Sequence, residues 1–214
     1  MANEITVIDY GVGNLFSVRK ALEHCGASVK LVSDPEALRL ASRVILPGVG
    51  AFGDGMALLA EHGMDEAVKE YAVRGGALLG VCLGMQLLLD TSEEFGLGHG
   101  LGLIPGKVIP IPEFSADGVR NKIPHIGWNS LVAPSGKSSW NSTILETTEL
   151  NSAMYFVHSY MAMPGNPAHR VADCIYGDTH IAAVIGRDNV WGAQFHPEKS
   201  GPAGLAILQE FVRR

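Results

Sequence analysis

The sequence predicts an α/β fold with one mostly parallel open sheet, helices on both of its faces, and a smaller antiparallel β region. Two observations lead to this prediction. Short apolar runs alternate with amphipathic stretches through residues 4–90, which is typical of strands alternating with helices. Beyond about residue 105, β-rich segments follow one another with little helical pattern between them.

The expected elements of the first part follow the apolar runs and their flanking turns. Gly11 and Gly13 mark a turn after the first strand, and Pro35 suits the first position of a helix. We expect strands at 4–9, 28–32, 43–46 and 77–81, and helices over 14–25, from Pro35 onward and over roughly 53–74.

The second part predicts strands that pair antiparallel in several places. We expect them at 107–109, 126–132, 154–161, 170–176, 181–187 and 190–195, with a closing helix over 201–214. Residues 134–151 are rich in Ser, Thr and Asn and are interpreted as a loop or a marginal helix with no assigned role. A length of 214 residues favours a single domain over residues 1–214.

Composition excludes several classes of function. The net charge is −6 and Lys and Arg are scattered, so we expect no nucleic-acid partner. The beginning of the chain has no secretory signal, and the longest apolar stretch, 76–89, is too short to span a bilayer, so we expect a cytoplasmic protein with no membrane association. The three cysteines and eight histidines show no metal-site spacing, so we expect no metal and no cofactor.

The segment Gly80-Val-Cys-Leu-Gly84 predicts a nucleophile at a sharp turn from strand to helix. Side chains two residues before and after the nucleophile would collide in such a turn, which explains both glycines. The turn would aim Cys82 outward at a helix N-terminus, where the thiolate is favoured. The alternative is that Cys82 is a small buried residue used for packing, the interpretation given to Cys25 and Cys174.

His196 and Glu198 are the candidates for a base and its orienting acid. Pro197 holds His196 out of the helical region, and in an extended stretch residues two apart point to the same side. A lone histidine after a strand is more often structural, so the assignment depends on Cys82 and Glu198 completing a triad.

Attack on an amide also requires N–H donors for the negative charge that develops on oxygen. The glycine-rich segment Pro47-Gly-Val-Gly50 follows a predicted strand and suits this task. We expect the N–H of Leu83 to act together with the N–H of Val49 or Gly50. The alternative is an ordinary turn at the end of a strand.

These three segments, in this order, resemble the class I (triad) glutamine amidotransferases, and the match covers essentially the whole chain. Further strings are similar to the glutaminase subunits of imidazole glycerol phosphate synthase. They are Asp9-Tyr-Gly-Val-Gly-Asn-Leu15, Lys122-Ile-Pro-His-Ile-Gly-Trp-Asn129, Tyr155-Phe-Val-His-Ser-Tyr160 and His196-Pro-Glu-Lys-Ser200.

The resemblance implies a flavodoxin-like fold and the hydrolysis of L-glutamine to glutamate and ammonia. Cys82 would attack the side-chain amide, His196 would carry the proton to the departing ammonia, and Glu198 would orient His196. The residues implied to grip the two ends of glutamine are Gly50, Gln86, Glu94, Ser159 and Tyr160.

The resemblance also implies a partner, the (β/α)8-barrel cyclase subunit, which would use the ammonia to make imidazole glycerol phosphate and the aminoimidazole carboxamide ribotide in histidine biosynthesis. The residues implied to lie at or near this contact are Asn14, His125, Trp128, Tyr155 and Lys199. In the family the strand around Val49 rearranges before it can donate, so glutaminase activity is expected to be weak until the cyclase binds its ligand.

Three other interpretations stay open at this point. The first is another triad amidotransferase of the same fold that feeds ammonia to a different synthase, although the 122–129 string favours imidazole glycerol phosphate synthase. A cysteine hydrolase or peptidase on a related sheet would act without a partner. A non-catalytic regulatory subunit would keep the fold and lose the chemistry, which the presence of Cys82, His196 and Glu198 disfavours.

Overall fold

A seven-stranded sheet with strand order β11-β12-β13-β4-β3-β1-β2 forms the centre of the protein in the computed structural model, which describes residues 3–214. The first two residues of the predicted domain lie outside the described residues. Five neighbouring strands are parallel, and β12 and β11 continue the sheet antiparallel. The strands are β1 (Glu4–Ile8), β2 (Ser28–Val32), β3 (Arg43–Leu46), β4 (Ala77–Val81), β11 (Arg170–Tyr176), β12 (Thr179–Arg187) and β13 (Val190–Ala193).

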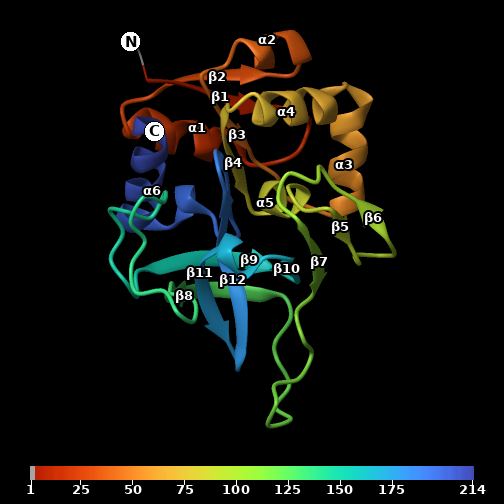
Figure 1. The fold of residues 1–214 in the computed structure, drawn as a ribbon, viewed down its shortest axis with the longest axis vertical. Coiled ribbons are helices and arrows are strands. Elements are labelled where there is room, and N and C mark those ends of the chain that lie inside the picture. The colour runs from red at the N-terminus through yellow and green to blue at the C-terminus, as the bar shows by residue number, and fades with distance from the viewer. Residues whose placement is uncertain (1–2) are drawn as a thin grey trace.

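Helices cover both faces of this sheet, as the alternation predicts (Figure 1). Successive strand residues point to opposite faces. Ile45 packs in the same cluster as residues of α1 and α6, whereas Val44 and Leu46 pack in the cluster that holds residues of α3 and α4. The helices are α1 (Leu15–His24), α2 (Pro35–Arg39), α3 (Phe52–Glu61), α4 (Met64–Val73), α5 (Leu83–Leu87) and α6 (Gly201–Arg213), with short 3-10 turns η1 (Pro167–His169) and η2 (Pro197–Lys199).

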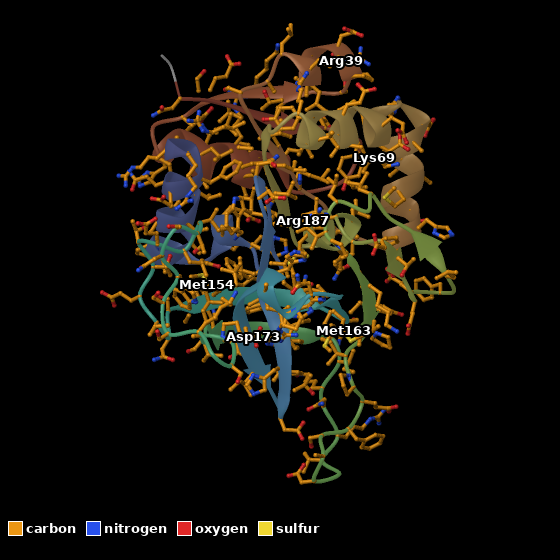
Figure 2. All side chains as sticks on the ribbon, in the orientation of Figure 1. Arg39, Lys69, Met154, Met163, Asp173 and Arg187 are labelled. Carbon is orange, nitrogen blue, oxygen red and sulfur yellow. The ribbon has the colours of Figure 1, made fainter. Side chains whose placement is uncertain are left out.

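The remaining strands form two smaller sheets. One has the order β10-β7-β5-β6, and the other is the antiparallel ribbon of β8 and β9. In Figure 2, Met154 of β9 and Asp173 of β11 lie in the lower half, far from Arg39 and Lys69 at the helical end. The strands are β5 (Thr91–Ser92), β6 (Gly98–His99), β7 (Gly106–Pro110), β8 (His125–Ser130), β9 (Ala153–His158) and β10 (Tyr160–Pro164).

The single strand expected over 154–161 is wrong, because the chain breaks at Ser159 and changes sheets. The segment before the break pairs with β8 and the segment after it pairs with β7. Both segments are apolar in alternation, so periodicity cannot separate them. As a result of this break, Ser159 and Tyr160 line the wall of a cavity.

The segment 134–151 is a loop, and it is partly built into the core. Its side chains Trp140 and Ile144 are buried in the cluster that includes α1 and α6. The guanidinium of Arg214, which follows α6, donates to the carbonyls of Ser142 and Thr143. These contacts give the loop a structural role that its polar composition does not indicate.

Within residues 3–214, no helix combines the length and the apolar character needed to cross a bilayer.

Candidate active site

The sheet order brings the predicted catalytic segments together. Strand β4, which ends before Cys82, lies between β3 and β13. The segment 47–50 follows β3 and His196 follows β13, and all three strands are parallel. Because parallel strands end at the same edge, these segments meet at the carboxyl edge of the sheet, where α/β proteins place their sites.

Cys82 sits in the strained turn that its glycines predict. Its φ is 54° and its ψ is −111°, a conformation that costs a non-glycine residue about 1–3 kcal/mol. A Cβ on Gly80 would lie 2.5 Å from the carbonyl oxygen of Gly84, and a Cβ on Gly84 would lie 1.9 Å from that of Leu46. The turn is therefore possible only with glycine at both positions. The following helix α5 ends at Leu87 and is shorter than the composition of 83–90 indicates.

Glu198 meets His196 at 2.8 Å, from Oε1 to Nδ1, and both side chains are almost fully buried. The expected contact between the two side chains is present, but the expected extended backbone conformation is not. Residues Pro197–Lys199 form the 3-10 turn η2, so Glu198 reaches the ring through a turn and not along an extended strand. The carboxylate accepts a hydrogen bond from Nδ1–H, which leaves Nε2 as the atom for proton transfer in the neutral ring.

His196 favours the protonated form. Burial lowers its pKa, but the close approach and charge of Cys82, together with the hydrogen bond and charge of Glu198, outweigh burial and raise the pKa from 6.5 to about 9. Its Nε2 is buried and has no partner with hydrogen-bond geometry among residues 3–214. An imidazole that holds a proton strongly beside a thiol is suited to take the thiol proton and leave a thiolate.

The segment 47–50 packs directly over the nucleophile turn. The hydroxyl of Tyr10 donates to the carbonyl of Pro47 at 2.8 Å, and the N–H of Leu83 donates to the carbonyl of Gly48 at 3.3 Å. A Cβ on Gly48 would lie 2.5 Å from the Tyr10 hydroxyl, so only glycine fits here. The Leu83 N–H, expected as an oxyanion donor, is thus occupied in this conformation.

A cavity of about 300 Å³ lies at this edge of the sheet. Of the predicted catalytic, oxyanion and glutamine-binding residues, all except Glu198 line it. They are Val49, Gly50, Cys82, Leu83, Gln86, Glu94, Ser159, Tyr160 and His196. Glu198 lies behind His196 in contact with its ring, so the structure brings these predicted residues together.

Two of the cavity residues are already held by hydrogen bonds. The carboxylate of Glu94 accepts from the N–H of Phe52 at 2.6 Å, at the N-terminus of α3. Gln86 donates from Nε2 to the carbonyl of Tyr160 at 3.1 Å and to Oε1 of Gln194 at 3.0 Å. Both side chains therefore have defined positions before any ligand binds.

The predicted contact residues lie mostly at the surface. Asn14 and Lys199 are exposed, and Trp128 is 59% exposed with its ring against the half-buried ring of Tyr155. His125 differs, because only 3% of it is exposed. It lies beneath this surface and not on it.

Sequence reasoning missed three polar residues at the site. Gln194 is fully buried and directs Nε2 toward the Cys82 sulfur at 3.9 Å. Ser200 accepts from the N–H of Tyr155 and donates to the carbonyl of His196, which fixes the backbone beside the base. His158 lines the cavity. For Gln194 and His158 the available signal was a polar side chain at the end of an otherwise apolar strand segment.

Comparison with known proteins agrees with this geometry. The family described as glutamine amidotransferase class-I matches residues 6–214. The chain belongs to the class I glutamine amidotransferases. As a member of this family it is an enzyme subunit.

Relatives over the full length narrow the family further. The chain is 52% identical over 211 residues to imidazole glycerol phosphate synthase subunit HisH 1 of Legionella pneumophila (strain Lens), covering 99% of both chains. It is 47% identical over 208 residues to subunit HisH of Geobacillus sp. (strain WCH70), covering 97% of this chain and 95% of the relative. The chain thus falls among the HisH subunits of the class I amidotransferases.

Solved structures support the fold alone, because their sequences are distant. The structure of PurLQS from Thermotoga maritima matches with a TM-score of 0.75 at 19% identity, covering 100% of this chain and 99% of that chain. A crystal structure of a glutamine amidotransferase matches with a TM-score of 0.72, also at 19% identity, covering 98% and 99%.

Proposed function

We propose that this chain is the glutaminase subunit of imidazole glycerol phosphate synthase. It hydrolyses L-glutamine to glutamate and ammonia and supplies the ammonia to a cyclase that makes imidazole glycerol phosphate and the aminoimidazole carboxamide ribotide in histidine biosynthesis. The observation that carries the proposal is the buried pair of His196 and Glu198, with His196 and Cys82 lining one cavity, in a chain about half identical to HisH subunits.

The proposed chemistry uses the triad in the order of its contacts. The Cys82 thiolate attacks the side-chain carbonyl carbon of glutamine, and the C–N bond breaks as His196 delivers its proton to the departing ammonia. His196 then removes a proton from water, whose oxygen attacks the glutamyl thioester and releases glutamate and Cys82. Glu198 keeps the ring oriented and stabilises its protonated form.

The proposed oxyanion donors are the N–H of Leu83 and that of Val49 or Gly50. The hydrogen bond from Leu83 to the Gly48 carbonyl must open before the first donor is free. A shift of the 47–50 segment would release it, and this requirement supports low glutaminase activity in the resting conformation. The cyclase and its ligand are the proposed trigger.

The proposed glutamine subsite lies opposite the nucleophile. The negative charge of Glu94 suits the ammonium group of glutamine, and the backbone of Gly50, Ser159 and Tyr160 suits its carboxylate. Gln86 would contribute from the floor of the cavity, where its side chain is held by Tyr160 and Gln194. Each group lines the same cavity as Cys82.

The proposed partner is a cyclase with a (β/α)8-barrel fold, bound at the face that carries Asn14, Trp128, Tyr155 and Lys199. An exposed Trp beside a Tyr is typical of the energetic centre of an interface. Exposed Phe16 and Ile126 add apolar surface. His125 would support this face from below. We further propose that the chain acts as one domain, in the cytoplasm, with no cofactor, metal, nucleic acid or membrane involved.

A glutaminase assay with and without the cyclase tests the proposal. We expect weak glutamate release from the chain alone, and a strong increase when the cyclase and its ribulosyl phosphate ligand are added. Activation by a different synthase, with no response to the cyclase, would assign the chain to another pathway. Strong cleavage of peptides or esters by the chain alone would favour a cysteine hydrolase.

A further inference from the structure

Two buried histidines beside the active site have no place in the triad chemistry. His125 on β8 and His158 on β9 are directly opposite each other in the β8–β9 ribbon. Nδ1 of His125 lies 3.0 Å from Nε2 of His158. Only 3% of His125 and 6% of His158 are exposed. A buried pair of this kind is stable only if one of the two ring nitrogens carries hydrogen and donates it, while the other carries none and accepts.

The proton positions follow from the partners. Nδ1 of His158 lies 2.9 Å from the carbonyl oxygen of Tyr160, which can only accept, so this nitrogen carries hydrogen. Burial lowers the pKa of both histidines to about 4, so both rings are neutral near neutral pH. Nε2 of His158 therefore accepts, and Nδ1 of His125 donates to it. Hydrogen bonds run in one direction, from His125 to His158 to the Tyr160 carbonyl.

The Tyr160 carbonyl is held from a second side. Gln86 donates to it from Nε2 at 3.1 Å and also bonds Gln194, whose Nε2 points at the Cys82 sulfur. A carbonyl oxygen has two lone pairs, and His158 and Gln86 use both. Tyr160 is thus fixed between the histidine pair and the network that reaches the nucleophile.

His125 is itself locked in place by stacking. Its ring centroid lies 4.0 Å from that of Tyr176 and 5.1 Å from that of Phe156, with nearly parallel planes. The hydroxyl of Tyr176 donates to the carbonyl of Lys122. The ring therefore cannot turn without disturbing both aromatic neighbours, so its Nδ1 remains directed at His158.

We propose that His125 and His158 are positioning residues for glutamine, through the backbone of Ser159 and Tyr160. His158 holds the Tyr160 carbonyl so that the break between β9 and β10 keeps its shape as one wall of the cavity, and His125 holds His158 as a donor. Neither acts as a base in the reaction. The inference rests on the proposed glutamine subsite.

The test compares variants that keep or remove the donor, each in complex with the cyclase and its ligand. His158→Phe removes the hydrogen bond to Tyr160, whereas His158→Asn keeps an N–H near the position of Nδ1. His125→Phe preserves the stacking and removes the donor, whereas His125→Asn keeps the donor. We expect KM for glutamine to rise about tenfold in each Phe variant with a smaller change in kcat, and to recover in the Asn variants, because one buried hydrogen bond contributes roughly this factor.

Labelling of Cys82 separates positioning from general damage. Iodoacetamide needs only the thiolate, so its rate should be unchanged in the Phe variants. A glutamine-like chloroketone needs the subsite as well, so its labelling rate should fall together with the rise in KM. Exposed His62, at the end of α3, provides a control: His62→Phe should change neither rate.

The outcomes distinguish the two proposals. An active parent complex with unchanged KM and chloroketone labelling in both Phe variants would overturn the positioning role alone. Equal loss of both labelling reactions, with no recovery in the Asn variants, would also overturn it, because the histidines would then be structural. A parent complex with no glutaminase activity would overturn the proposed function and this inference with it.

Discussion

The carboxylate of Glu198 accepts a hydrogen bond from Nδ1 of His196 at 2.8 Å, and only 2% of the Glu198 side chain is exposed. A carboxylate so far from water is stabilised chiefly by its partner, and the protonated imidazole is stabilised in return. The pair therefore links proton binding at the active site to the stability of the fold.

This linkage predicts a pH-dependent stability. The pKa of His196 rises from 6.5 to about 9 on folding, so its contribution is complete below pH 6.5 and is lost as pH rises toward 9. The contribution is at most about 3 kcal/mol at 1.36 kcal/mol per pKa unit. Urea unfolding across this pH range should show the decline in the parent. Glu198→Gln should make the decline shallower, with the part that is due to Cys82 remaining, and an equally steep decline in that variant would contradict the assignment.

Replacing Cys82, the proposed nucleophile, should separate glutamine hydrolysis from the use of ammonia by the cyclase. In the complex with the cyclase, Cys82→Ala should abolish glutamine-dependent turnover, because no thioester can form. Turnover with added ammonium should be retained. Parallel assays with the two nitrogen sources measure this, and loss of both activities would indicate that Cys82 is needed for the structure instead.

Gly84, two residues after the proposed nucleophile Cys82, should be required for folding. Gly84→Ala would place a methyl group 1.9 Å from the carbonyl oxygen of Leu46. We expect a loss of about 3 kcal/mol or more in the free energy of unfolding, at the upper end of overpacking costs. Gly53→Ala is the control, because nothing lies within 4 Å of the added methyl in helix α3, and it should be neutral or slightly stabilising. Similar effects at both sites would refute the steric argument.

Trp128 should be an energetic centre of the cyclase contact. Trp128→Ala should weaken binding to the cyclase by about 2 kcal/mol or more, as truncation of buried interface aromatics does. Calorimetric titration provides the measurement. Val73→Ala is a matched control, since Val73 is 85% exposed at the end of α4, away from the β8–β9 ribbon (Figure 1). Equal affinity of the Trp128 variant and the parent would indicate that the cyclase binds at another surface.

Lys199 should affect coupling more than catalysis. Its side chain is exposed immediately after the triad residue Glu198. Lys199→Ala should therefore leave KM for glutamine nearly unchanged while more glutamate is released per turnover of the cyclase. The ratio of the two products tests this, and an unaltered ratio would exclude Lys199 from coupling.

The sequence predicts most of the parallel sheet and the residues of the candidate triad that the structure brings together, because both depend on local patterns. β2, β3 and β4 begin and end where the apolar runs do. The meeting of Cys82 and His196 then follows from the parallel arrangement, since neighbouring strands end at one edge. The positions of Gly80 and Gly84 are likewise explained by the turn between them.

The remaining features depend on contacts between distant segments. Gln194 and Gln86 are 108 positions apart, and no spacing within either strand or helix indicates their hydrogen bond. The break at Ser159 arises because β9 and β10 have different partners, which an alternating apolar pattern does not record. The sequence predicts an extended stretch at 196–198 where the structure has the 3-10 turn η2, because Pro197 is compatible with both conformations.

Under the proposed function, the hydrogen bond between the Leu83 N–H and the Gly48 carbonyl has a consequence for the nitrogen balance of the cell. If this contact holds the enzyme at rest, surplus copies of the chain would not drain the glutamine pool. Ammonia, which diffuses away readily, would then be released only when the cyclase has bound the substrate that accepts it. A single backbone contact would then match nitrogen release to biosynthetic demand.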